Sequence, residues 1–241
     1  MYLYYEMNEI SAKIYSLLMA VFVVMLVLTN IIGTKIFVLF GETLPNGLFG
    51  FPLALTAGII TYPITFLVTD ITSEIFGKKK ANLLVLYGFF CSVLSLIIIN
   101  IVINLVPSEA WLGGSPYNSL EEMNQAFNAV FSLPGILISA SMTAYLVAQL
   151  IDIRIFHFVK KITNAKYLWL RNNLSTMFSQ LIDTIIVNSI FLGFGMNLDT
   201  ELIIQIIICN YIVKLIFALI DTPLVYLGVF IIRRKFLIDK L

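Results

Sequence analysis

The sequence predicts an all-α, polytopic membrane protein with six transmembrane helices, and three observations support this fold class. First, the 241 residues are 60% hydrophobic and 12% charged, whereas soluble domains are about 45–50% apolar and about 25% charged. Second, apolar windows of about 20 residues, the length that crosses a bilayer, recur along the chain. Third, the Lys and Arg residues that lie outside these windows occur only in alternate connecting segments. The net charge of +1 gives no reason to expect a nucleic-acid partner.

Each apolar window is expected to form one helix, because lipid offers no hydrogen-bond partner to the backbone. Ten-residue segments of alternating polarity, which would indicate a membrane barrel, do not occur. The expected spans are Ile14–Phe40, Phe51–Phe76, Ala81–Val106, Phe127–Ile153, Leu174–Phe194 and Leu202–Ile232. The hydrophilic stretches are too short for a soluble catalytic domain. Residues 1–241 are therefore expected to form a single six-helix transmembrane domain.

The positions of the basic residues predict the orientation of these spans. Lys and Arg lie before the first span and in the segments that follow the second, fourth and sixth spans. The other segments, Gly41–Gly50, Pro107–Ala126 and Gly195–Glu201, contain none. Because cytoplasmic loops are enriched in Lys and Arg, both termini are expected in the cytoplasm.

Ionisable residues within the spans are candidates for function, because each costs about 2.5–3.5 kcal/mol at the centre of a bilayer. They are Lys35, Asp70, Glu74, Asp183, Lys214 and Asp221, with Asp152 at an edge. Asp183 and Lys214 fall near the expected midplane. Glu74 and Asp152 lie close enough to the cytoplasmic interface to have the weakest functional case.

Polar residues at helical spacing predict three inward-facing polar faces that together line a cavity. The fifth window presents Asn172, Thr176, Ser179, Gln180 and Asp183 on one face, and Thr184 and Asn188 continue it. The second window presents Tyr62, Thr65, Thr69, Asp70, Ser73 and Glu74, and Pro52 and Pro63 are expected to bend it. In the sixth window, Lys214 and Asp221 lie two turns apart, before an expected break at residues 221–223.

Two interpretations of these faces remain open. Polar side chains also hold membrane helices together, and a lysine can neutralise an aspartate in a purely structural pair. However, Lys35 and Lys214 cannot neutralise four acids, so the cavity is expected to favour a cation, a neutral ligand rich in hydrogen-bond donors, or protons.

Catalysis and cofactor binding are not expected from this sequence. His157 is expected in a basic loop, and Cys91 and Cys209 lie in apolar runs, so a metal site lacks ligands. The sequence contains no phosphate-binding loop and no zinc-protease motif. An intramembrane hydrolase would need a nucleophile with a base or a metal, and neither is evident.

Four segments in order resemble the queuosine precursor transporter family, over about 200 residues from Thr29 to Tyr226. They are FPLALTAGIITYPITFLVTDITSEIFGKKKA, AFNAVF with ISASMTAYLVAQLIDIRIF, LWLRNNLSTMFSQLIDTIIVNSIF, and the segment from Lys214 that ends in DTPLVY. The resemblance implies a fold similar to the substrate-binding membrane subunits of energy-coupling vitamin transporters.

The resemblance further implies an inner-membrane importer of 7-deazaguanines for the salvage of queuosine in transfer RNA. The substrates would be 7-cyano-7-deazaguanine, 7-aminomethyl-7-deazaguanine and, in some bacteria, queuine. A carboxylate can accept the two adjacent donors of such a ring. We therefore expect Asp183 with Gln180 at the ring edge, and Asp70 or Asp221 as a second acid. Further binding candidates are Asn188, Asn30, Lys214, Asn172 and Glu74.

The mode of transport remains open at this stage. The protein could transport by itself, as a secondary or facilitative importer. Alternatively, it could be the substrate-binding membrane subunit for another small vitamin-like molecule and depend on a separate energising complex. A homodimer is plausible for a bundle of only six helices.

Overall fold

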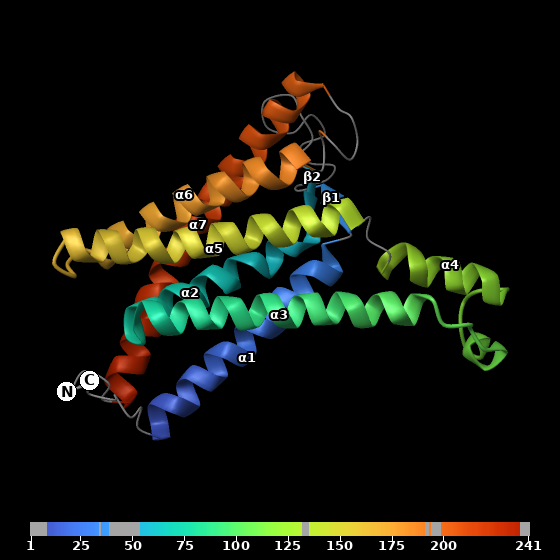
Figure 1. Ribbon diagram of the computed structural model, residues 1–241, viewed down its shortest axis with the longest axis horizontal. Coiled ribbons are helices and arrows are strands. Elements are labelled where there is room, and N and C mark those ends of the chain that lie inside the picture. The colour runs from blue at the N-terminus through green and yellow to red at the C-terminus, as the bar shows by residue number, and fades with distance from the viewer. Residues whose placement is uncertain are drawn as a thin grey trace.

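The computed structural model describes residues 9–33, 35–38, 54–131, 135–190, 193 and 199–236, and in these ranges it is an all-α membrane protein with one small strand pair (Figure 1). The helices are α1 (Glu9–Ile32), α2 (Tyr62–Ile75), α3 (Gly77–Ile103), α4 (Leu120–Phe131), α5 (Gly135–Ile162), α6 (Leu168–Asn188) and α7 (Thr200–Phe236). Short 3₁₀ turns lie at Ala57–Ile60 and Glu109–Leu112. Strands β1 (Ile36–Val38) and β2 (Ala54–Thr56) pair antiparallel, with Phe37 opposite Leu55.

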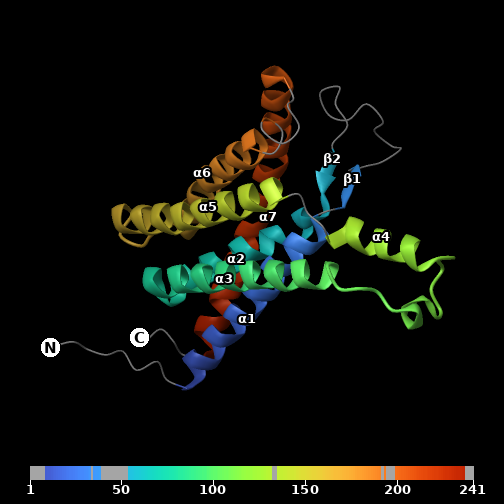
Figure 2. The ribbon, with the colours of Figure 1, turned by 45° about the vertical axis from the view of Figure 1, so that its right-hand side comes forward.

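Helix α2 occupies the middle of the bundle, where it contacts α1, α3, α5 and α7. Helices α5 and α6 form a hairpin that packs against α7 through α6 (Figure 1). The start of α1, the α2–α3 turn, the α5–α6 turn and the end of α7 all lie at one end of the bundle, whereas β1, β2 and α4 lie toward the other (Figures 1 and 2). The polar faces of α2, α5 and α6 therefore meet in the interior.

Four helices in the described ranges are long and apolar enough to cross a membrane. Their candidate spans are Glu9–Ile32, Gly77–Ile103, Ser141–Ile162 and Ile206–Arg234. Helices α1, α3 and α7 expose large apolar side chains, including Leu17, Phe90 and Phe230, as lipid-facing helices do. Of the other two expected spans, α2 has only 14 residues, and α6 carries a polar face.

The first two expected spans are wrong as continuous helices. Helix α1 ends at Ile32, and residues 36–38 are strand rather than helix. At Gly33, a Cβ atom would lie 2.7 Å from the carbonyl oxygen of Thr29, so the chain passes too close to α1 for a side chain. Pro63 does not bend the second span but lies in the first turn of α2, where a missing N–H costs nothing. Pro52 lies outside the described residues.

The remaining expected spans need smaller corrections. Residues 127–131 of the fourth window belong to α4, an amphipathic helix separate from α5. The expected break at residues 221–223 is also wrong, because α7 continues through Pro223. His157 lies in α5, not in a loop, because α5 continues to Ile162. The expected loop Gly41–Gly50 and most of Gly195–Glu201 lie outside the described residues.

Close packing holds α1 and α7 against the centre of the bundle. A Cβ atom at Gly88 of α3 would lie 2.3 Å from the ring of Phe22 in α1, and one at Gly228 of α7 would lie 2.5 Å from Ile71 in α2. Both apolar partners are buried. These two glycines allow α3 to approach α1 and α7 to approach α2 closely.

Candidate functional site

Helix α6 contributes the most polar buried surface of the described chain. All eight of its buried residues are polar or charged: Arg171, Asn172, Ser175, Thr176, Ser179, Gln180, Asp183 and Thr184. The polar stripe predicted for the fifth window is therefore confirmed as an inward face. Burial of this many polar groups is costly unless each finds a partner, so their contacts indicate what the interior does.

Asp183 forms an ion pair with Lys214, which reaches it from α7. The Lys214 Nζ lies 2.6 Å from the Asp183 Oδ2, and the two side chains are 18% and 7% exposed. The same Nζ lies 5.0 Å from the centre of the Tyr62 ring, in the geometry of a cation–π contact. The Tyr62 hydroxyl lies close to the Asp183 carboxylate but makes no well-formed hydrogen bond there.

A narrow pocket opens beside this ion pair, between α2, α6 and α7. Its enclosed space is only about 20 Å³. Its polar wall is formed by Gln180, Lys214 and Asp221, and its aromatic wall includes Tyr62, Phe66 and Phe217. Asp183 does not line the pocket directly but lies behind Lys214. The Gln180 Oε1 is buried without a hydrogen-bond partner, which is rare for a buried polar atom.

Asp70 of α2 faces a second carboxyl group, Asp152 of α5. The two side chains lie within hydrogen-bonding reach and are 2% and 0% exposed. Ser179 of α6 donates to the Asp152 Oδ1 at 3.0 Å. Asp221, which lines the pocket, acts electrostatically on Asp70. No ion pair of the described residues includes Asp70, Asp152 or Asp221.

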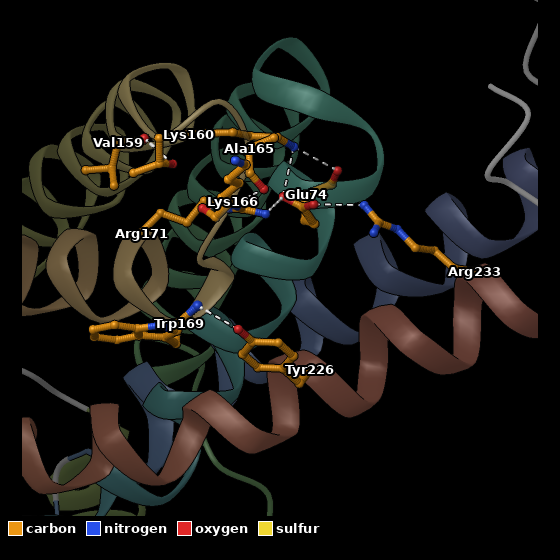
Figure 3. Close-up of polar contacts among 10 residues, drawn as sticks. Glu74, Val159, Lys160, Ala165, Lys166, Trp169, Arg171, Tyr226 and Arg233 are labelled. Carbon is orange, nitrogen blue, oxygen red and sulfur yellow. Dashed lines mark hydrogen bonds and ion pairs between the residues drawn. The ribbon is translucent and has the colours of Figure 1, made fainter.

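Glu74 lies one turn beyond Asp70 on α2 and has the opposite environment, because three cations surround it (Figure 3). Its carboxylate oxygens lie 2.8 Å from Lys160 of α5, 2.7 Å from Arg171 of α6 and 2.8 Å from Arg233 of α7. Arg171 also donates to the carbonyl oxygens of Ala165 and Lys166, at 3.0 and 3.2 Å, in the α5–α6 turn. Glu74 therefore ties four helices together and is not one of the surplus acids.

The three candidate asparagines make contacts outside the pocket lining. The Asn30 Nδ2 lies 3.5 Å from the Met142 Sδ, and the Asn188 Nδ2 donates to the Thr184 carbonyl on its own helix at 2.7 Å. The Asn172 Nδ2 lies 3.4 Å from the Thr222 Oγ1 of α7. The structure therefore brings Asp183, Gln180, Lys214 and Asp221 together, with Asp70 behind them, and leaves the other candidates apart.

Two polar residues of this interior, Tyr145 and Gln149, were not among the candidates selected from the sequence, and a third, Asp152, was given one of the weakest functional cases. Tyr145, Gln149 and Asp152 lie on one face of α5 at spacings of four and three residues, and all three are buried. That spacing is the signal that could have identified them. In the described chain, no group of three or more His, Cys, Asp or Glu side chains has an arrangement that would hold a metal ion.

Comparisons with known proteins agree on one family. A family model described as "Putative vitamin uptake transporter" matches residues 56–228. The chain is 27% identical over 178 residues to a protein of Bacillus subtilis (strain 168) named probable queuosine precursor transporter, a match that covers 73% of this chain and 72% of the relative. No solved structure shows significant similarity.

Two further relatives carry the same kind of name. A probable queuosine precursor transporter of Haemophilus influenzae is 30% identical over 135 residues, which cover 56% of this chain and 51% of the relative. The queuosine precursor transporter of Escherichia coli (strain K12) is 25% identical over 180 residues, which cover 73% and 72%. Together with the apolar helices, these matches indicate a multi-pass membrane transporter. The chain belongs to the "Putative vitamin uptake transporter" family.

Proposed function

We propose that this chain imports queuosine precursors of the 7-deazaguanine class across the inner membrane, for queuosine salvage, and binds them between α2, α6 and α7. The observation that carries the proposal is the buried Lys214–Asp183 pair beside Gln180, next to a pocket with an aromatic wall. The names of the relatives supply the substrate class.

The ion pair suits the edge of a guanine-like ring. That edge presents a carbonyl acceptor, a ring N–H donor and an exocyclic amine donor in a row. A lysine next to a carboxylate presents one donor and two acceptors, which is the complementary order. In the structure, which we call the closed arrangement, Lys214 is the partner of the Asp183 carboxylate. A ligand therefore binds when Lys214 turns to donate to the ring carbonyl and the two N–H donors of the ring donate to the Asp183 carboxylate in place of the lysine, with Gln180 as a further hydrogen-bond partner.

The aromatic wall of the pocket can contact the face of the ring, and Asp221 can contact its substituent. Stacking of a base on Tyr62, Phe66 or Phe217 would contribute about 1–3 kcal/mol. Asp221 lines the pocket and can accept a cationic aminomethyl substituent, so we prefer it to Asp70 as the second acid. The enclosed space in the present pocket is about 20 Å³, enough for about one water molecule, so the pocket has to widen before a base enters.

Other candidates have a supporting role in this proposal. Asn172 and Glu74 join α6 and α2 to their neighbours, and Asn30 and Asn188 contact Met142 and the α6 backbone. We assign to them the positioning of helices rather than contact with the base.

We also propose a single domain of six membrane crossings with both termini in the cytoplasm. Four crossings would be the candidate spans in α1, α3, α5 and α7, and α2 and α6 would supply the other two. In support, the turns and helix ends that carry most of the Lys and Arg residues lie at one end of the bundle (Figure 1), as the distribution of positive charge in membrane proteins requires.

Replacement of Asp183 tests the substrate site. Asp183→Asn changes one acceptor into a donor, which opposes a donor of the ring. Loss of a charge-assisted hydrogen bond costs about 1.5–3 kcal/mol, so uptake should fall at least about tenfold. The measurement is uptake of labelled 7-cyano-7-deazaguanine by cells that cannot synthesise it, normalised to the membrane content of the protein. Asp199→Asn, at an exposed position, is the matched control. Unchanged uptake by Asp183→Asn would remove Asp183 from the site.

Reconstitution separates autonomous transport from dependence on an energising complex. If the purified chain alone moves labelled 7-cyano-7-deazaguanine into lipid vesicles, it is a complete transporter. Binding without uptake would instead favour a substrate-binding subunit similar to those of energy-coupling vitamin transporters. Competition by guanine, queuine and each precursor in the same assay would define the substrate.

A further inference from the structure

We propose that Asp70 and Asp152 form a proton-binding pair, which holds one proton between the two carboxyl groups when α2 and α5 are closed together and releases it when they separate. The role of this pair in transport rests on the proposed function above, whereas the presence of the proton does not.

The first step in the argument is the absence of a compensating charge. Asp70 and Asp152 are almost fully buried and lie within hydrogen-bonding reach of each other. No ion pair of the described residues includes either one. Two ionised carboxylates this close in a buried setting repel strongly, and such pairs share a proton.

The second step concerns the hydrogen bonds. Ser179 donates to the Asp152 Oδ1 at 3.0 Å. The hydroxyls of Ser175 and Thr176 also lie close to the Asp152 carboxylate, but the Ser175 hydroxyl donates to the Asn172 carbonyl at 3.2 Å. The Asp152 Oδ2 and the Asp70 Oδ1 are both buried and have no donor. The hydroxyl of Thr69, next to Asp70, donates to the Thr65 carbonyl of its own helix at 2.7 Å. A proton held between the carboxyl groups supplies the donor that these oxygens lack.

The third step is an independent sign of a missing hydrogen-bond partner at the same place. Gln149 lies one turn before Asp152 on α5 and is fully buried, yet neither its Oε1 nor its Nε2 has a partner. A satisfied structural amide would have both. The Tyr145 hydroxyl lies close to Gln149 but also makes no well-formed hydrogen bond, so the polar groups beside the pair have hydrogen-bonding capacity that is not used.

The surrounding charges favour a proton over a metal ion. Asp221 of α7 acts on Asp70 from the pocket side. One turn along α2, Glu74 is bound by Arg171 of α6, Lys160 of α5 and Arg233 of α7, so these cations are already occupied. No ion pair of the described residues joins α1 or α3 to the pair. No group of three or more His, Cys, Asp or Glu side chains in the described ranges has an arrangement that would hold a metal ion, whereas a proton needs only the two carboxyl groups.

The proton balance is simple. In the closed arrangement, one carboxylic acid donates to one carboxylate, and the pair carries one negative charge. When α2 moves away from α5, water reaches both groups, and the proton passes to water and leaves two carboxylates. Because α2 also forms a wall of the substrate pocket, a movement that widens the pocket disturbs the pair. The transport cycle therefore includes one protonation step.

Infrared spectroscopy of the purified chain tests the proton directly, without a substrate. A protonated carboxyl group has a C=O stretching band that a carboxylate lacks. Asp221, which also lacks an ion pair among the described residues, is first replaced by Asn so that it cannot contribute. We expect the band at neutral pH in the wild type and in Asp221→Asn, and its loss when the double variant Asp70→Asn with Asp152→Asn is made in the Asp221→Asn background. Absence of the band from Asp221→Asn, or its persistence after the two further changes, would overturn the proposal.

Transport by vesicles tests the coupling. Uptake of labelled 7-cyano-7-deazaguanine by the wild type should change with pH, because closure requires the proton. In the double variant, the two asparagine side chains form an amide hydrogen bond that needs no bound proton. Its uptake, expressed relative to its own maximum, should therefore not change with pH. The same pH profile in both proteins would overturn the coupling. If the wild type transports no 7-deazaguanine at all, the proposed function fails, while the infrared band still decides the proton site.

Discussion

Glu74 and Asp70 lie one turn apart on α2, yet their environments are opposite. Glu74 meets three cations from three other helices. Asp70 meets a second acid from α5, and a third acts on it from α7. Around Glu74, positive charges outnumber negative ones. Around Asp70, no ion pair of the described residues would compensate the acids if all of them were ionised.

The comparison indicates a division of roles along α2. The contacts of Glu74 fasten α2 to the α5–α6 turn and to the end of α7, where Arg171 also holds the turn (Figure 3). Broken ion pairs at such a place would leave charges buried, so this end resists change. The stability of the contact between Asp70 and Asp152 depends on whether one proton is bound, so this contact responds to pH. Glu74, whose charge is held by ion pairs, and Asp70, whose charge depends on a shared proton, thus lie one helical turn apart.

The largest effect is expected for Glu74→Gln. This change leaves Arg171, whose side chain is 2% exposed, buried without a counter-charge. Loss of one partner of a buried ion pair costs about 3–5 kcal/mol, and for a chain of this size that lowers Tm by roughly 10 °C. Thermal unfolding in detergent micelles, followed by circular dichroism, measures the change.

The matched control for Glu74→Gln is Glu9→Gln. Glu9 pairs with Lys13 at 2.6 Å, but both side chains are more than 70% exposed, and exposed pairs contribute little. Its Tm should remain that of the wild type. Equal Tm values for the two variants would show that the Glu74 cluster does not fasten the helices.

A smaller effect is expected at Asp183, through Lys214→Met. This change leaves Asp183 buried without a counter-charge, but Lys214 is 18% exposed, so water compensates in part. We expect a loss of about 2–3 kcal/mol. Addition of Asp183→Asn should recover most of that loss, because a neutral pair no longer contains an isolated charge. A double-mutant cycle measured by thermal unfolding isolates this coupling, and additive losses would contradict it.

The sequence predicts the apolar helices and the inward face of α6 because both depend on local periodicity. Helix α3 begins at Gly77 and ends at Ile103, close to its expected limits, since its apolar run is uninterrupted. The polar stripe from Asn172 to Asp183 is buried as its spacing predicts. By contrast, hydropathy cannot distinguish a helix from the short strand at 36–38, because both are apolar.

The partners of the buried acids could not be predicted in the same way. Glu74 pairs with residues 86 and 159 positions away in the chain, and only the packing of the helices brings them together. Distance from the nearer loop placed Asp152 at an edge, with a weak functional case. In the structure it is fully buried and faces Asp70. Depth along one helix does not reveal which residue of another helix lies opposite.

The smallest effect is expected for Asp70→Asn, and it is the sharpest test of the comparison. An asparagine donates an N–H to Asp152 in place of the shared proton, so the hydrogen bond persists and the pair keeps its single negative charge. The free energy of unfolding should change by less than about 1 kcal/mol, the range of a single neutral hydrogen bond. Thermal unfolding of Asp70→Asn and Glu74→Gln in the same detergent and buffer measures the two losses of stability for comparison. A loss at Asp70 as large as that at Glu74 would mean that the Asp70 carboxylate has a positively charged partner, and the two acids would then belong to one continuous ion network.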